Sequence, residues 1–168
     1  MNRLESRPAS RLPELVTHTF HPRRGPFHNL CELPALEAGR WLDEMRAVGR
    51  CLRPGYLARR HATEERLRAE RGAKLGPTPL RHPIYFFLGD FADGRDPARP
   101  CSIRLPLSAL PARAITFTWG DSMSGGELLT LTELEARVEA EGLPPREWGF
   151  IELQLWDRAP LIALEAAP

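Results

Sequence analysis

The most apolar aromatic run of the chain lies near its middle, where residues 83–88 read PIYFFL. An acidic turn that contains two glycines, residues 89–94, follows this run directly. A short apolar run that opens into a polar turn is typical of a strand buried on both faces. Because loops at strand ends often carry binding and catalytic groups, this strand is the centre of the predicted architecture.

Alternation of apolar and polar positions predicts further strands. They are expected at residues 15–20, 102–107, 115–119 and 150–156, and the uniformly apolar residues 161–164 are interpreted as a final strand. In the segment 150–156, Ile151, Leu153 and Leu155 alternate with Glu152 and Gln154. Since successive strand residues point to opposite faces of a sheet, the two polar residues should share the face opposite the three aliphatic ones.

Helical spacing of apolar residues predicts three helices. They are expected at residues 34–48, at about residues 56–71, and at residues 132–142. Pro34 suits the first turn of the first helix and Gly49 suits its end. Thr132 and Glu135 have the spacing of a capping box for the third helix.

Helices thus concentrate before residue 75 and strands after residue 83, which indicates an α+β protein rather than an alternating βαβ protein. We expect one domain, residues 15–168, in which N-terminal helices pack on a mostly antiparallel mixed sheet formed largely by residues 83–164. The Arg- and Pro-containing residues 1–14 have little apolar content and are predicted to form a flexible N-terminal arm.

The second predicted helix carries charge on the same stripe as its leucines. Helical spacing lines up Arg60, Glu64 and Arg71 with Leu57 and Leu67. The stripe either lies half exposed, with i, i+4 ion pairs in solvent, or directs Arg60 and Glu64 into a cleft. The solvated arrangement is the one we favour from sequence, because exposed ion pairs at this spacing are common.

Composition describes an ordinary globular protein, with 42% hydrophobic and 27% charged residues. No apolar run reaches the roughly 20 residues of a membrane span, and the N-terminus has no signal-peptide core, so a cytoplasmic protein without a membrane partner is expected. The widely spaced Cys31, Cys51 and Cys101 are read as reduced thiols.

The near-neutral total charge hides an asymmetry between the two halves of the chain. Residues 1–81 hold 16 basic and 9 acidic residues, a difference of +7, whereas residues 82–168 hold 7 and 13, a difference of −6. Arginine accounts for almost all of the positive charge, and its planar fork suits phosphates and carboxylates. The asymmetry also suits docking of the two halves on each other.

No established catalytic or metal-binding motif is present. The loop after residue 20 gathers His21, His28, Arg23 and Arg24 close to His18, but without the spacing of a metal site, so we predict no metal and favour a loop that faces an anion. The three aspartates of residues 90–96 lie three apart, unlike the ligands of a calcium loop, and are typical of turns.

The order of the segments V-T-H-T-F, I-Y-F-F-L and F-I-E-L-Q-L-W resembles the histidine, tyrosine, glutamate order of the ADP-ribosyltransferase fold. The resemblance implies that His18 hydrogen-bonds the ribose of NAD, Tyr85 stacks on nicotinamide, and Glu152 orients the ribose hydroxyl at the anomeric carbon. It also implies that Arg23 or Arg24 lies near the pyrophosphate. The candidate catalytic residues are therefore Glu152, Tyr85 and His18, and the candidate NAD-binding residues are His18, Tyr85, Arg23, Arg24 and Arg60.

On this hypothesis NAD is a substrate, and its ADP-ribose passes to a protein or nucleic-acid acceptor. Two other functions stay open. A non-catalytic interaction protein, such as an immunity partner, would explain the charge asymmetry without any catalytic site. A nucleic-acid-binding module would use the Arg-rich segment 50–71 as a basic face, although its interleaved glutamates argue against this.

Overall fold

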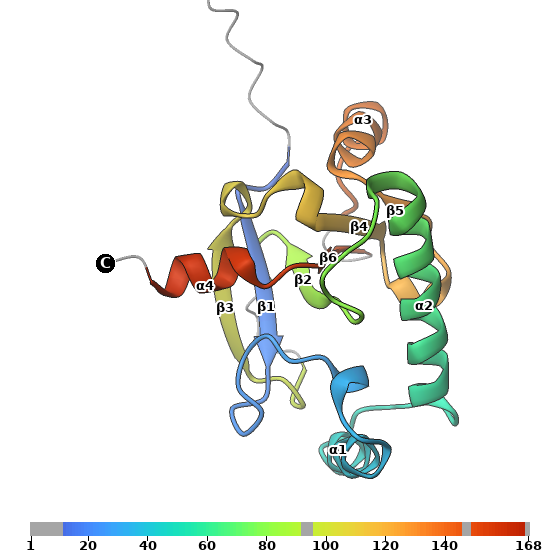
Figure 1. Ribbon diagram of the computed structural model, residues 1–168. Coiled ribbons are helices and arrows are strands. Elements are labelled where there is room, and N and C mark those ends of the chain that lie inside the picture. The colour runs from blue at the N-terminus through green and yellow to red at the C-terminus, as the bar shows by residue number, and fades with distance from the viewer. Residues whose placement is uncertain (1–11, 92–95, 146–148, 167–168) are drawn as a thin grey trace, which may run out of the picture.

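Six strands form one open sheet in the order β3-β1-β2-β6-β4-β5, and each pair of neighbouring strands is antiparallel (Figure 1). The computed structural model describes residues 12–91, 96–145 and 149–166 of the chain. The strands are β1 (Leu15–Phe20), β2 (Ile84–Leu88), β3 (Cys101–Pro106), β4 (Ile115–Trp119), β5 (Leu128–Leu129) and β6 (Ile151–Leu155). The run predicted to be central is β2, which lies between β1 and β6 inside the sheet.

The strands at the centre of the sheet divide into an apolar face and a polar face. The apolar face forms the main core and includes Ile84, Phe86, Leu88, Ile115, Phe117, Ile151, Leu153 and Leu155. On the other face, Tyr85 pairs with Gln154 and Phe87 pairs with Glu152. Because paired residues of antiparallel strands share a face, the side chains of Tyr85 and Glu152 lie on the same side of the sheet.

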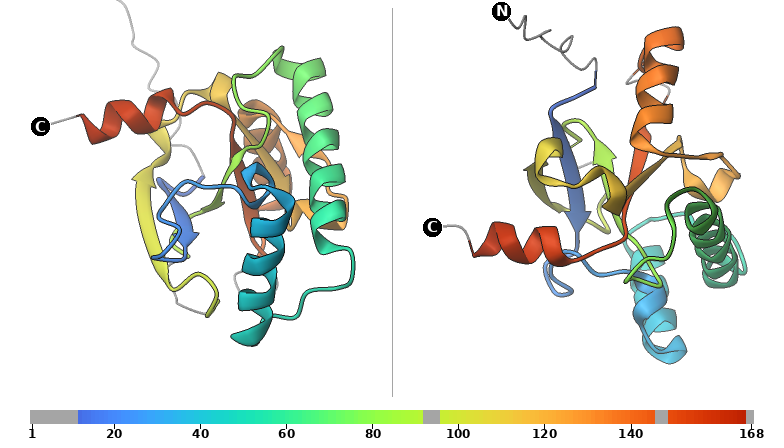
Figure 2. Two further views of the ribbon diagram at one scale, coloured as in Figure 1. Left: turned by 60° about the horizontal axis from the view of Figure 1, so that its bottom comes forward. Right: turned by 45° about the horizontal axis from the view of Figure 1, so that its top comes forward.

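The four α-helices cover both faces. They are α1 (Ala35–Ala47), α2 (Tyr56–Leu75), α3 (Leu131–Glu141) and α4 (Ala159–Glu165). Leu134 of α3 and Leu161 of α4 belong to the main core. Leu67 of α2 instead forms a small separate cluster with Leu128 and Trp156. Figure 2 shows α4 extending away from α1 and α2.

The α+β class and most predicted elements are confirmed, but three local predictions are wrong. Residues 161–164 belong to helix α4 rather than to a strand, because Pro160 suits a first helical turn and Asp157 accepts a bond from the Ala159 amide. The capping box of α3 is formed by Thr130 and Glu133, two residues before the predicted pair. Helix α2 continues past the predicted end to Leu75.

The predicted N-terminal arm is only partly within the described part of the chain. Residues 1–11 lie outside the described residues. Leu12, which was assigned to the arm, is 6% exposed and packs in the main core. The Leu107 amide donates to the Glu14 carbonyl, so the chain is already tied to the sheet before β1 begins.

Candidate functional site

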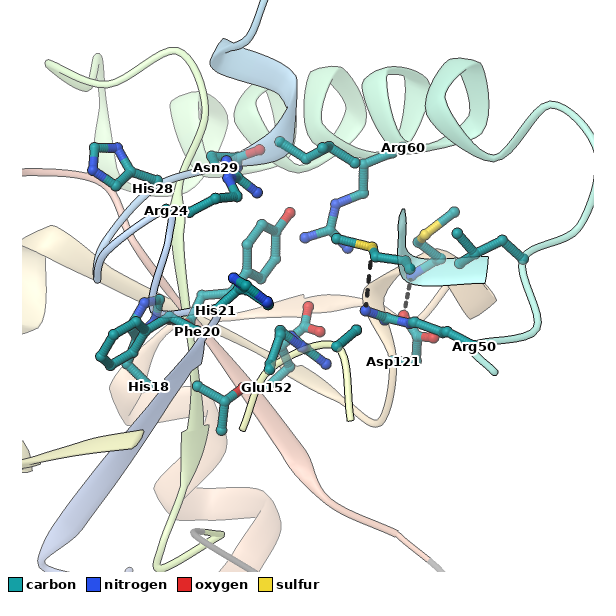
Figure 3. Close-up of a pocket in the computed structure, with 18 of the residues that line it drawn as sticks. His18, Phe20, His21, Arg24, His28, Asn29, Arg50, Arg60, Asp121 and Glu152 are labelled. Carbon is teal, nitrogen blue, oxygen red and sulfur yellow. Dashed lines mark hydrogen bonds between the residues drawn. The ribbon is translucent and has the colours of Figure 1, made fainter. Parts of the chain in front are cut away.

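A cavity of about 390 Å³ opens on the polar face of the sheet. Its walls come from the loop after β1, helix α2 and strands β2 and β6. In Figure 3 the Arg60 side chain extends from α2 toward Glu152 on the sheet, with Arg24 and His28 on one side and Arg50 on the other. The volume is in the usual range of small-molecule sites.

Five of the six candidate residues line this one cavity. They are His18, Arg24, Arg60, Tyr85 and Glu152. Arg23 is not among the lining residues; its exposed guanidinium forms an ion pair with Glu44 and lies over the Trp41 ring, 5.1 Å from the centroid. The resemblance offers Arg23 and Arg24 as alternatives near the pyrophosphate. Of the two, only Arg24 lines the cavity.

Glu152 is the buried acid of the site. It is 8% exposed, so the solvated sheet face that its alternating pattern also allowed is excluded. Burial raises the pKa of its carboxyl above the ordinary value, while the Arg60 guanidinium and the nearby Ser122 hydroxyl oppose that rise. A carboxylate in this position is costly to keep ionised, and Arg60 supplies most of the compensation.

A chain of buried hydrogen bonds holds the Glu152 carboxylate in place. Gln154 Nε2 donates to Glu152 Oε1 at 3.2 Å and to Thr118 Oγ1 at 3.0 Å. Gln154 Oε1 accepts from Thr116 Oγ1 at 3.0 Å, and Thr116 Oγ1 in turn accepts from the Trp156 indole at 2.7 Å. Because both ends of the Gln154 amide are bound, the orientation of its Nε2 group toward Glu152 is fixed.

Arg60 joins the carboxylate to the aromatic wall. Its guanidinium carbon lies 4.0 Å from the centroid of the Tyr85 ring, and its Nε donates to Glu64 Oε1 at 3.1 Å. Although burial lowers the pKa of Arg60, the surrounding Tyr85, Glu152 and Glu64 raise it above the ordinary value. Arg60 is therefore a permanent cation stacked on an aromatic ring, a favourable cation–π arrangement.

Tyr85 presents an unpaired polar tip. Its buried hydroxyl has no hydrogen-bond partner among the described residues. Burial raises the pKa of this phenol well above its usual value, and the Arg60 charge offsets only part of that rise. The hydroxyl is thus neutral.

Glu64, which sequence reasoning left as a solvated residue, is the hub behind Arg60. It is 1% exposed, and besides Arg60 it accepts from Asn29 Nδ2 at 2.9 Å and from His82 Nδ1 at 2.6 Å. The solvated arrangement of the α2 stripe is therefore wrong, and the cleft arrangement is observed. The signal was the position of Glu64 between leucines on one helical face, but its partners lie too far away in sequence to be identified.

His18 is held by the backbone rather than presented to a ligand. Its Nδ1 lies 2.8 Å from the Tyr85 carbonyl, and its Nε2 accepts from the Phe27 amide at 2.8 Å. Its ring packs against the rings of Phe86, which is a residue of the main core, and of Phe27, which packs against that core. Burial lowers the pKa of His18 to about 4. A neutral imidazole with both nitrogens bound positions the loop after β1 against β2.

Arginines supply positive charge around the cavity. Asp96 binds both Arg50, at 3.3 Å, and Arg99, at 2.9 Å. Burial raises the pKa of Asp96, but the two arginines outweigh it and leave the pKa below the ordinary value. Arg24 has a buried Nη2 without a partner among the described residues. These cations suit an anionic ligand such as a phosphate ester.

Three arginines of the Arg-rich segment 50–71 are used in contacts within the molecule. Arg66 and Arg71 each donate two hydrogen bonds to backbone carbonyls of neighbouring loops, and Arg60 pairs with Glu64. Arginines used in this way are not free to bind phosphates of a nucleic acid. Arg53, Arg59 and Arg68 of the same segment are exposed, so the nucleic-acid-binding alternative stays a prediction.

The cysteines and two further histidines complete the description of the reactive side chains. Cys31, Cys51 and Cys101 are free thiols, as predicted. Among the described residues, Cys31, His61 and His82 gather beside Glu64 as potential metal ligands.

None of the described helices has the length and apolar character needed to cross a bilayer. No protein-family model, curated protein or solved structure matches this chain, so its function has to be inferred from the site.

Proposed function

We propose that this protein is an ADP-ribosyltransferase-like enzyme that uses NAD as a substrate. The single observation that carries the proposal is the shared cavity: a buried glutamate, a stacked tyrosine–arginine pair and further arginines line one space. Glu152 and Tyr85, which the chain separates by 67 positions, share one sheet face. That combination suits a ligand with a flat ring, a sugar and phosphates.

The reaction chemistry of NAD explains why a buried carboxylate is useful here. When the bond between ribose and nicotinamide breaks, nicotinamide leaves as a neutral molecule and positive charge remains on the ribose. An acceptor then bonds to the anomeric carbon and loses its proton to solvent. The Glu152 carboxylate supplies a fixed negative charge in a site of low polarity, where such a charge stabilises a cationic centre strongly. Gln154 keeps that carboxylate oriented, and Arg60 offsets part of the burial that disfavours its ionised form.

The remaining lining residues fit the other parts of NAD. Tyr85 offers an aromatic surface and an unpaired hydroxyl for the nicotinamide ring. Arg24, Arg50 and Arg99 offer guanidinium groups to the pyrophosphate. Arg24 and Tyr85, which line this cavity, each carry a buried donor without a partner among the described residues.

His18 has a different role in this proposal from the one that the resemblance implies. Because both ring nitrogens already bind backbone groups, His18 fixes the loop that carries Arg24 rather than contacting the ribose. The proposed catalytic residue is Glu152, and Tyr85, Arg60 and Arg24 bind the substrate.

The test compares nicotinamide release from NAD by the wild type and by Glu152→Gln, with water or added protein as acceptor. We expect release by the wild type and a loss of about 10²–10³-fold in the variant, because one charge that stabilises the transition state is removed. Glu141→Gln, an exposed acid on α3, is the matched control and should keep the wild-type rate. Equal rates in Glu152→Gln and wild type, or no binding of NAD by the wild type, would reject the proposal.

A stability measurement separates loss of chemistry from loss of fold. The raised pKa of Glu152 means that its carboxyl stabilises the fold at low pH and loses that contribution as pH rises. At neutral pH a glutamine avoids the buried charge and still accepts the bond from Gln154. Glu152→Gln should therefore have a Tm equal to or above that of the wild type, and a strongly lowered Tm would make its inactivity uninformative about catalysis.

A further inference from the structure

A second group of chemically reactive side chains lies outside the cavity. Cys31 Sγ and one ring nitrogen each of His61 and His82 lie within 4.8 Å of one another. They come from three separate segments: the 3₁₀ turn Leu30–Glu32, helix α2 and the segment before β2. None of the three lines the cavity that we assign to NAD. Their separation along the chain hides the group from any analysis of motif spacing.

The donor set of this group is typical of zinc. One thiolate and two imidazoles are ligands that zinc prefers, usually with a fourth position filled by water or another side chain. Zinc bonds of about 2.0–2.3 Å in a tetrahedron place neighbouring ligand atoms roughly 3.5 Å apart. Atoms that already lie within 4.8 Å need only small side-chain movements to reach that geometry.

A buried carboxylate behind the group provides an independent reason to assign a metal. His82 Nδ1 lies 2.6 Å from Glu64 Oε2, and since a carboxylate accepts, Nδ1 carries the proton. The other nitrogen, Nε2, is then the one left with a lone pair for a metal. Carboxylate–histidine pairs of this kind orient the histidine ligands of zinc sites.

We propose that Cys31, His61 and His82 bind one zinc ion, with Glu64 as the carboxylate that orients His82. The ion ties the turn at residues 30–32 and the start of β2 to helix α2. It would thus brace the wall of the cavity that Arg60 forms, because Arg60 pairs with Glu64. This site does not depend on the reaction proposed above.

The test uses the purified full-length chain in reduced form, with zinc and cobalt as probes. Zinc binding is measured by competition with a chromophoric chelator, and cobalt is followed by the absorption of a cobalt–thiolate bond. The wild type should bind one equivalent of either metal and give the thiolate absorption. No saturable binding by the wild type, or cobalt binding without that absorption, would overturn the proposal.

Variants locate the metal. Cys31→Ser and His61→Asn should weaken zinc binding at least 100-fold, and Glu64→Gln should weaken it about 10–100-fold. Cys51→Ser and His28→Asn, which replace exposed residues of the same types, should bind as the wild type does. Zinc should raise the Tm of the wild type and of both controls but not that of His61→Asn. Unchanged zinc affinity in both Cys31→Ser and His61→Asn would refute the site.

Discussion

Two residues of the polar site show how single side chains take opposite tasks. Glu152 is buried with a raised pKa and a partner that orients it, an environment that suits the catalytic role proposed for it. His18 is also buried, but its bonds to two backbone groups leave nothing to offer a ligand. Residue type alone does not distinguish these tasks, whereas the hydrogen-bond partners do.

The buried neutral His18 should make folding stability depend on pH. Burial holds its pKa near 4, with smaller contributions from Arg99 and His28, whereas an unfolded histidine titrates near 6.5. The unfolded chain therefore binds more protons between these values, and stability is lost as pH falls from about 6.5 to about 4. This difference is worth up to about 3 kcal/mol.

Urea unfolding of the wild type and of His18→Gln between pH 7 and pH 4 checks this expectation. The variant should be less stable at pH 7 but should lose less free energy of unfolding as the pH falls. Parallel pH curves for the two proteins would show that His18 does not titrate as its burial implies.

At the scale of elements, helix α2 turns a charged stripe inward. Leu67 is fully buried on this stripe, and Glu64 beside it is buried with three hydrogen-bond donors. Such a helix gains its position from a few specific polar contacts as much as from apolar packing. Each of these contacts is made in a place from which water is excluded, so removing one partner leaves the others unsatisfied.

Two ion pairs at the same i, i+4 spacing should differ sharply in their contribution to stability. Glu64→Ala leaves Arg60 and two further donors without their acceptor, and should cost about 3–5 kcal/mol of unfolding free energy. Glu141→Ala removes only the exposed partner of Arg137 and should cost less than about 1 kcal/mol. Chemical denaturation in the presence of a metal chelator compares the two, and equal losses would contradict the assigned burial of Glu64.

The elements that the sequence predicted well are those with a strong local pattern. Alternation identified β1, β4 and β6 to within one residue, because each strand has one apolar face. The strand prediction failed for residues 161–164. Leu161 is buried there but Ile162 is 63% exposed, so these consecutive apolar residues do not pack on both faces as a buried strand would. Strand β5 has two residues, too few for any periodic signal.

The site was predictable only where a residue type was unusual for its place. A glutamate in the middle of a strand marked Glu152, and an aromatic with a polar tip marked Tyr85. Alternation also placed Gln154 on the face of Glu152, and the stripe of the second helix marked Arg60 as a candidate, but the contact of Arg60 with Tyr85 depends on the fold and could not be predicted. The hub at Glu64 connects positions 29 and 82, and no pattern within one helix reveals such long-range contacts.

At the scale of the whole molecule, the cavity lies where the two oppositely charged halves of the chain meet. Arg24, Arg50 and Arg60 come from the basic half, and Tyr85 and Glu152 come from the acidic half. The basic half thus forms a wall with three of the four lining arginines, Arg99 being the fourth, and the acidic half forms a wall that carries the Glu152 carboxylate. An anionic substrate would be drawn to the first wall and would place its reacting end at the second.

Neighbouring arginines provide a matched test of this arrangement. Arg24→Gln removes a guanidinium from the cavity and should raise the KM for NAD about 10–100-fold, the usual effect of losing a charged hydrogen bond. Arg23→Gln alters the same net charge outside the cavity and should change KM less than about twofold. Equal effects of the two substitutions would mean that the loop acts through general charge rather than through a contact in the cavity.

The division of β6 into an apolar and a polar face limits how the chain can change during evolution. Loops around the sheet can gain or lose residues, since their side chains have no fixed face. One residue inserted in the middle of β6 would instead turn every following side chain of the strand to the opposite face of the sheet. A polar residue would then enter the core, or a core leucine would face the cavity. The length of this strand is thus fixed by the packing of its two faces.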